Sequence, residues 1–166
     1  TAANNTAVGL AALYANTTGA QNTAVGRFSL DANTTASGNS AFGNAALTAN
    51  TTGAMNTALG AYALDANTTA NDNTAVGAHA LTENTTGTRN TGIGVSVLDS
   101  NTTGSYNTAM GDHALNSNNA DHNVAVGYGA LNTNSTGTRN HAFGNNALYA
   151  NTTGSQLAAI GYNALR

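Results

Sequence analysis

The sequence predicts an all-β fold, a single-stack β-solenoid (β-roll) of ten 17-residue coils, and three observations lead to this prediction. A glycine recurs at a fixed interval along the whole chain, a leucine follows each glycine four residues later, and Asn-Thr-Thr turns separate most of these pairs. Glycine, asparagine and threonine are poor formers of helix interiors, and a two-helix repeat needs about 33 residues or more. Residues 1–166 therefore form one repeat domain.

The period of the repeat is set by its glycines. Every step between them is 17 residues except the step from Gly111 to Gly127, which is 16. The consensus N-T-A-[apolar]-G-x-x-A-L-x-x-N-T-T-G-x-x suits one coil of short strands joined by tight turns. Coils would then stack at the strand spacing of about 4.8 Å. The glycines, which we expect to adopt positive φ or to allow close backbone approach, are Gly9, Gly26, Gly43, Gly60, Gly77, Gly94, Gly111, Gly127, Gly144 and Gly161.

Two columns of apolar residues are the predicted core. One is the leucine column, Leu13, Leu30, Leu47, Leu64, Leu81, Leu98, Leu115, Leu131, Leu148 and Leu165. The other is the apolar column, Val8, Val25, Phe42, Leu59, Val76, Ile93, Met110, Val126, Phe143 and Ile160. Stacking places each residue over its own copy, so a thin continuous core results.

The residue before each apolar one points to the opposite face of a strand. Alanine is a poor strand former, so an alanine column there suggests that something flat packs closely against it, such as a second subunit, a neighbouring rod or ice. This candidate interface face comprises Ala7, Ala24, Ala41, Ala58, Ala75, Ala109, Ala125, Ala142 and Ala159, with Gly92 in the sixth coil. By the same alternation the column that begins at Thr6 is expected to point inward, with the apolar column.

Asparagine opens each Asn-Thr-Thr turn, where its amide can bond local backbone and the copies above and below. The predicted amide ladder is Asn16, Asn33, Asn50, Asn67, Asn84, Asn101, Asn134 and Asn151. The one short repeat lacks a residue between Asn116 and His122, which predicts that the deletion falls in the turn while the strands keep their alignment. A weaker 34-residue rhythm places Asp31, Asp65 and Asp99 in alternate coils, which keeps like charges about 9.6 Å apart.

Composition excludes several function classes. Only 7% of residues are charged, the net charge is −3 and there is no lysine, which argues against nucleic acid and anionic membranes as partners. No apolar run is long enough to insert into a bilayer. Cysteine is absent, so a disulfide scaffold is excluded. The chain starts at Thr1 and ends within a repeat without capping segments, from which we expect a mature form or an excised piece.

The sequence contains no group of residues in a spacing typical of a reactive site, so we expect no catalytic, metal or cofactor site. His79 and His113 share a column but lie two coils apart, about 9.6 Å, too far to ligate one ion together. The serines have no histidine at a fixed offset, and the aspartates lack the pattern of calcium-binding β-rolls. A glycan partner is suggested only by the tyrosines, Tyr14, Tyr62, Tyr106, Tyr128, Tyr149 and Tyr162.

Residues 73–81, N-T-A-V-G-A-H-A-L, represent a unit that resembles the head repeats of trimeric autotransporter adhesins of the YadA-head or Hep_Hag type. The full unit is still more similar to the N-T-A-x-G-x-x-A-L-x-x-N-T-T-G arrays of phage tail-fibre and bacterial surface proteins. The resemblance covers all ten units, although 17 residues exceed the adhesin repeat of about 14. It implies a left-handed β-roll, self-association as a trimer, and a location outside the cell, on its surface or on a virion appendage.

The leading functional hypothesis is a non-catalytic extracellular rod, the shaft or head of a surface adhesin, tail fibre or filament. We expect it to associate with itself as a trimer or end to end, with a host-surface receptor or glycan as a further partner. The alternative is an ice-binding solenoid that uses exposed threonine arrays. Its candidate ice face is Thr17, Thr34, Thr51, Thr68, Thr85, Thr102 and Thr152.

Overall fold

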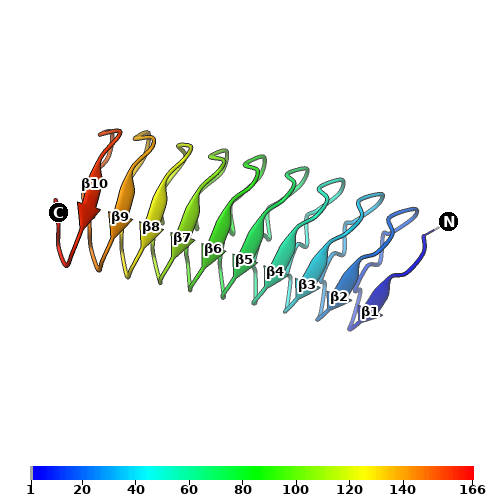
Figure 1. Ribbon diagram of the computed structural model, residues 1–166. Coiled ribbons are helices and arrows are strands. Elements are labelled where there is room, and N and C mark those ends of the chain that lie inside the picture. The colour runs from blue at the N-terminus through cyan, green and yellow to red at the C-terminus, as the bar shows by residue number, and fades with distance from the viewer. Residues whose placement is uncertain (1) are drawn as a thin grey trace.

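A computed structural model describes residues 2–166 as a parallel β-solenoid, and no helix occurs in this part of the chain. Figure 1 shows the coils stacked in one row from the N-terminus to the C-terminus, with the strands side by side along one face. All strands belong to one sheet, in the order β1 to β10. They are β1 (Thr6–Val8), β2 (Thr23–Val25), β3 (Ser40–Phe42), β4 (Thr57–Leu59), β5 (Thr74–Val76), β6 (Thr91–Ile93), β7 (Thr108–Met110), β8 (Val124–Val126), β9 (His141–Phe143) and β10 (Ala158–Ile160).

Each strand pairs in parallel with the strand one coil away, in the register that the repeat predicts. Ala24 lies opposite Ala41, for example, and Val25 opposite Phe42. Hydrogen bonds between coils continue outside the strands: the amide of Leu30 donates to the Ala46 carbonyl at 3.0 Å, and that of Ala32 to Thr48 at 3.1 Å. Backbone pairing around the perimeter therefore holds the coils together, although only three residues per coil are strand.

The leucine half of the predicted core is confirmed. The members of the leucine column from Leu13 to Leu148 are buried, whereas Leu165, in the last coil, is exposed. Small residues pack against them from the position just before each leucine, such as Ala46 and Ala63. The interior is therefore a single spine of leucine lined by alanine.

The prediction for the two faces of the strand is wrong. The apolar column faces outward, and the alanine column lies inside with the leucines; Ala7, in the first coil, is exposed. Strand alternation allows either assignment, and the width of a 17-residue coil decides between them, because leucine already fills the interior and leaves room only for a methyl group opposite. The alanines wrongly assigned to an interface face are Ala24, Ala41, Ala58, Ala75, Ala109, Ala125, Ala142 and Ala159.

The turn asparagines form the predicted ladder along the interior. The Asn33 amide donates to the Asn16 carbonyl oxygen at 2.9 Å, and Asn50 donates to Asn33 at 3.1 Å. Each also donates to the carbonyl three residues ahead, as Asn50 does to Gly53 at 2.9 Å. Because every amide is bonded, burial of these polar groups is tolerated.

A second asparagine ladder, not anticipated from the sequence, runs beside the first. Asn39, immediately before β3, accepts the Asn56 backbone N–H through Oδ1 at 2.9 Å and donates through Nδ2 to the Gly53 carbonyl at 2.9 Å. That carbonyl also accepts from Asn50, so two amides from opposite ends of the coil meet on one oxygen. The second ladder thus closes each coil across its interior. Its buried members are Asn22, Asn39, Asn56, Asn73, Asn90, Asn107, Asn123 and Asn140.

The short coil confirms that the deletion lies in the turn. Met110 and Val126 remain opposite each other in the sheet, and Asn118 takes the ladder position, donating to Asn101 at 3.1 Å and accepting from Asn134 at 2.8 Å. Asn119 stands where other coils have two threonines. The lost residue is therefore absorbed without a change of register.

The glycine column marks the corner after each strand. Gly111 has φ 122°, and a Cβ atom there would lie 2.7 Å from the carbonyl group of Gly127 in the next coil. A side chain would therefore strain the backbone and collide with the stacked copy. This confirms the expectation that the column combines positive φ with close approach.

Candidate functional site

The outer face of the ten-stranded sheet presents two parallel columns of side chains. The apolar column is well exposed in the middle of the rod, with Leu59 at 49% and Met110 at 47%. The first residue of each strand points the same way, which corrects the expectation that the column beginning at Thr6 faces inward. We call this the threonine column: Thr6, Thr23, Ser40, Thr57, Thr74, Thr91, Thr108, Val124, His141 and Ala158.

The sheet face is regular because the chain repeats in register. Successive strands lie about 4.8 Å apart, so nine spacings give a stripe on the order of 45 Å long. Neither outward column contains Asp, Glu, Lys or Arg, and His141 is its one titratable residue. The face is therefore long, largely apolar and uncharged.

Residues just beyond the glycine corner widen the apolar stripe at several coils. Leu10 and Val95 are both exposed large hydrophobic residues, as is Tyr128. Contiguous exposed apolar surface of this kind is uncommon on monomeric proteins, and it usually marks a site of interaction. Nothing in the sequence distinguished this surface from a core column, because both require apolar residues at the same spacing.

The candidate ice-face threonines lie on the turns, away from the sheet face. The hydroxyl of Thr17 donates to the Thr34 carbonyl at 2.9 Å, and that of Thr51 to Thr68 at 3.0 Å. Thr85 repeats the contact with Thr102, also at 3.0 Å. These hydroxyls secure the stacking of the turns, and in the turns from Thr34 to Thr103 the second threonine is the more exposed.

Histidine and tyrosine rings from neighbouring coils stack on each other at two positions of the repeat. The rings of Tyr62 and His79 stack with centroids 5.2 Å apart, and those of Tyr106 and His122 at 4.9 Å. Arg89 joins the second pair through the Tyr106 hydroxyl at 2.5 Å. In the part of the chain that the structure describes, no group of three or more His, Cys, Asp or Glu side chains could hold a metal ion.

Among the aspartates of the 34-residue rhythm, Asp65 has a perturbed acidity. Burial raises the pKa of its carboxyl group above the ordinary value of 3.8, and this effect outweighs the opposing influences of the Thr48 hydroxyl and of His79. The two neighbouring coils contribute Thr48 and Thr82 at the same position, so no carboxylate stacks directly on Asp65. The arrangement suits charge spacing within the stack rather than paired carboxylate chemistry.

No helix long and apolar enough to cross a membrane occurs within residues 2–166. Comparisons with models of protein families, with curated proteins and with solved structures found no match to this chain.

Proposed function

We propose that the chain is a non-catalytic structural rod of an extracellular assembly, such as the shaft or head of a surface adhesin, a tail fibre or a filament. In this proposal copies of the rod associate side by side along the sheet face formed by the apolar and threonine columns. The single observation that carries the proposal is the outward apolar column, which continues from coil to coil along the whole sheet.

The occupant that best fits this face is a second copy of the same chain. Two copies carry side chains at the same spacing along the rod. The side chains of one copy can therefore fit between those of the other over the full length of the sheet face. The absence of charged residues in both columns removes like-charge repulsion between identical faces. Burial of exposed residues such as Phe42, Leu59 and Met110 would supply the driving force.

Sedimentation velocity over a range of concentrations tests the proposal on the full chain. We expect a concentration-dependent oligomer for the wild type, and a monomer for a variant with Leu59→Lys and Ile93→Lys, because two buried charges would oppose the contact. Both sites are exposed in the isolated rod, so the variant should remain folded.

Matched controls come from the same two coils. Thr69→Lys with Thr103→Lys adds the same charge on the turn edge, where both threonines are exposed. This control should assemble like the wild type. A monomeric wild type at high concentration, or equal dissociation of both variants, would contradict assembly through the sheet face.

A second candidate, ice binding, is favoured by one specific observation. The outward threonines of β4 to β7, Thr57, Thr74, Thr91 and Thr108, lie in register on adjacent strands and form an unbroken hydroxyl row beside the apolar column. The second candidate therefore uses the sheet threonines as its ice face instead of the turn threonines. Bulky residues such as Phe42, Met110 and Phe143 make this face uneven. An uneven face fits a second protein surface better than ice, which favours the assembly proposal.

Thermal hysteresis separates the two candidates. An ice-binding rod should depress the freezing point and shape ice crystals at micromolar concentration, and Thr74→Lys with Thr91→Lys should remove this effect. Absence of both ice shaping and partition into ice would exclude the second candidate and leave the assembly proposal unaffected.

A further inference from the structure

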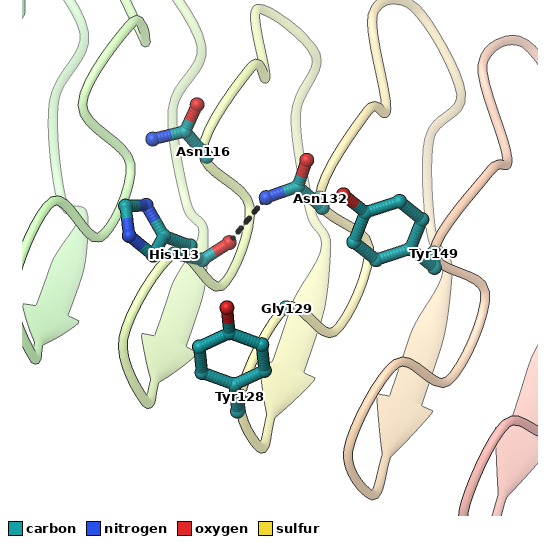
Figure 2. A pocket seen from close by; sticks show the side chains of 6 residues that line it. All are labelled: His113, Asn116, Tyr128, Gly129, Asn132 and Tyr149. Atoms are coloured by element: carbon teal, nitrogen blue, oxygen red, sulfur yellow. Dashed lines mark hydrogen bonds between the residues drawn. The ribbon is translucent and has the colours of Figure 1, made fainter.

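A groove interrupts the regular surface of the rod near its C-terminal end. It has a volume of 310 Å³ and is lined by His113, Asn116, Tyr128, Gly129, Asn132 and Tyr149 (Figure 2). These residues come from three successive coils and lie beyond the glycine corner. None of the lining residues belongs to the apolar or the threonine column, so the groove is distinct from the sheet face, which it adjoins at Tyr128.

Gly129, which has no side chain, lies at the floor of the groove and lets neighbouring side chains approach closely. Its φ of 61° is shared by other residues of the same column, among them His113 at 57° and Asn146 at 55°. The backbone therefore does not require glycine at this position. A Cβ atom at Gly129 would lie 2.7 Å from Oδ1 of Asn146 and 3.3 Å from the Tyr149 ring, so both side chains lean into the space that the glycine leaves.

Two asparagines with fixed amide orientation line the groove. Nδ2 of Asn132 donates to the His113 carbonyl at 3.0 Å, and Nδ2 of Asn116 donates to Ser96 at 3.0 Å. That bond fixes the orientation of each amide. The Asn116 Oδ1 atom also accepts from the Ser117 hydroxyl at 3.4 Å, and Figure 2 shows the Oδ1 atoms of both asparagines on the side of the amide away from Tyr128. Such carbonyl oxygens accept hydrogen bonds from ligand hydroxyl groups.

Aromatic rings form two walls of the groove. Tyr128 is 55% exposed and meets the His113 ring edge to face, with centroids 6.2 Å apart. Tyr149 forms the opposite wall, and the Tyr128 hydroxyl points toward the interval between His113 and Asn132 (Figure 2). Tyrosine combines an apolar ring surface with a polar tip that can donate or accept.

We propose that this groove binds a neutral carbohydrate, one or two pyranose units of a glycan. A pyranose ring has a C–H face that packs on an aromatic ring and hydroxyl groups that pair with amides. Both kinds of group converge here, in a volume at the lower end of the range for small-ligand sites. None of the lining residues is Asp, Glu, Lys or Arg, so no lining carboxylate or guanidinium favours a charged sugar.

A protein-observed NMR titration of the full chain, with assigned tyrosine ring signals, tests the site with the methyl α- and β-pyranosides of glucose, galactose, mannose and N-acetylglucosamine. Methyl galacturonide and methyl N-acetylneuraminide serve as charged probes. We expect at least one neutral glycoside to bind with a dissociation constant on the order of 1 mM and to shift the ring signals of Tyr128 and Tyr149. No shift with any neutral glycoside at saturating concentration, or shifts with the acidic probes alone, would overturn the proposal.

Gly129→Asn introduces a side chain that must displace Asn146 Oδ1 and the Tyr149 ring at the groove, at a backbone position where the column already carries Asn146 and Asn163. We expect this variant to bind about tenfold more weakly or worse. Ala11→Asn introduces the same residue at the equivalent position of the first coil, and this variant should bind like the wild type. Tyr128→Ala, at an exposed position, provides a second variant that should also lose binding. Wild-type affinity in both groove variants would contradict the site.

Discussion

Gly92 and Val97 show how little free volume the interior of the rod has. In this coil glycine replaces the alanine of the strand, and valine replaces the small residue before leucine. A Cβ atom at Gly92 would lie 3.0 Å from Cγ1 of Val97 and 3.4 Å from the Leu81 side chain. The two departures from the repeat therefore compensate each other, and the volume of the core layer is kept.

This compensation predicts a non-additive pair of substitutions. Gly92→Ala should destabilise the fold by about 1 kcal/mol through overpacking, and Val97→Ala by about 1 to 2 kcal/mol through a cavity. The double variant restores the usual alanine pair and should be more stable than either single variant. Urea denaturation of all four chains measures the coupling, which should exceed about 0.5 kcal/mol; additive effects would contradict the packing argument.

Asp65 gives a prediction for pH dependence at the same scale. Because its pKa is higher in the folded state than the ordinary 3.8, the unfolded chain binds fewer protons above that value, and this group lowers stability as pH rises through the interval between the two values. Asp65→Asn removes the ionisable group. The variant should therefore gain stability relative to the wild type at about pH 7 and lose that gain at about pH 3.

Thermal unfolding of both chains at the two pH values measures this difference. The comparison carries its own control for packing, since a change in packing persists at both pH values, whereas loss of the Thr48 hydrogen bond to the ionised carboxylate would act in the opposite direction. A difference in stability that does not depend on pH would show that burial of the carboxylate charge is not the cause.

At the scale of the structural element, the short coil is stabilised by a side chain that substitutes for backbone. In a complete turn the carbonyl of Thr34 accepts from the amides of Thr17 and Thr18, at 2.9 and 3.2 Å, and from the Thr17 hydroxyl at 2.9 Å. In the short coil Oδ1 of Asn119 accepts the same three bonds from Thr102 and Thr103, at 2.7, 3.3 and 2.8 Å. An amide oxygen thus replaces the carbonyl of the missing residue.

Asn119→Ala should therefore destabilise the rod by about 1 kcal/mol or more, because three donors lose one acceptor. Asn119→Asp keeps an acceptor and should remain close to the wild type. Asn145→Ala is the matched control, since this exposed asparagine accepts only one long bond, from Tyr128 at 3.3 Å. Equal losses of unfolding free energy for Asn119→Ala and Asn145→Ala in chemical denaturation would show that the hydrogen bonds accepted by the Asn119 side chain do not stabilise the rod.

Particular residues show how far the sequence predicts such elements. The leucines, the corner glycines and the turn asparagines were predictable because stacking demands the same residue in every coil. The outward direction of Val25 and its copies was not, since alternation relates neighbours along a strand but does not state which side is inside. The second asparagine ladder, formed by Asn39 and its copies, was also not predicted, although an asparagine that recurs immediately before most strands indicates a structural role.

The candidate sites also combine features that the sequence predicts with features that it does not. The sheet face depends on which side of the strand is inside, so the repeat identifies its two columns but not their outward direction. The groove depends on one glycine in a column that otherwise carries side chains, and only the stacking of three coils brings Tyr128 and Tyr149 around it. A departure from a repeat becomes informative only when the neighbours of that position are known.

At the scale of the whole molecule, stability depends on nearest-neighbour contacts between coils, so deleting one complete coil should leave a folded rod. Deletion of residues 39–55 places the coil of Asp31 directly beside that of Asp65, about 4.8 Å away along the stack. Deletion of residues 56–72 removes the same number of residues but brings Thr48 beside Thr82. The two chains are thus matched in length and in number of coils, and only the first stacks two carboxylates.

At about pH 7 the 39–55 deletion should be the less stable chain by about 1 kcal/mol, the repulsion of two unit charges at this distance in a water-like dielectric. The gap should close below about pH 4, where the carboxyl groups become protonated. Circular dichroism should report the same β content for both, and thermal unfolding at the two pH values measures the gap. If the gap persists in acid, or if the 56–72 deletion is the less stable, the 34-residue rhythm does not serve to separate charge along the rod.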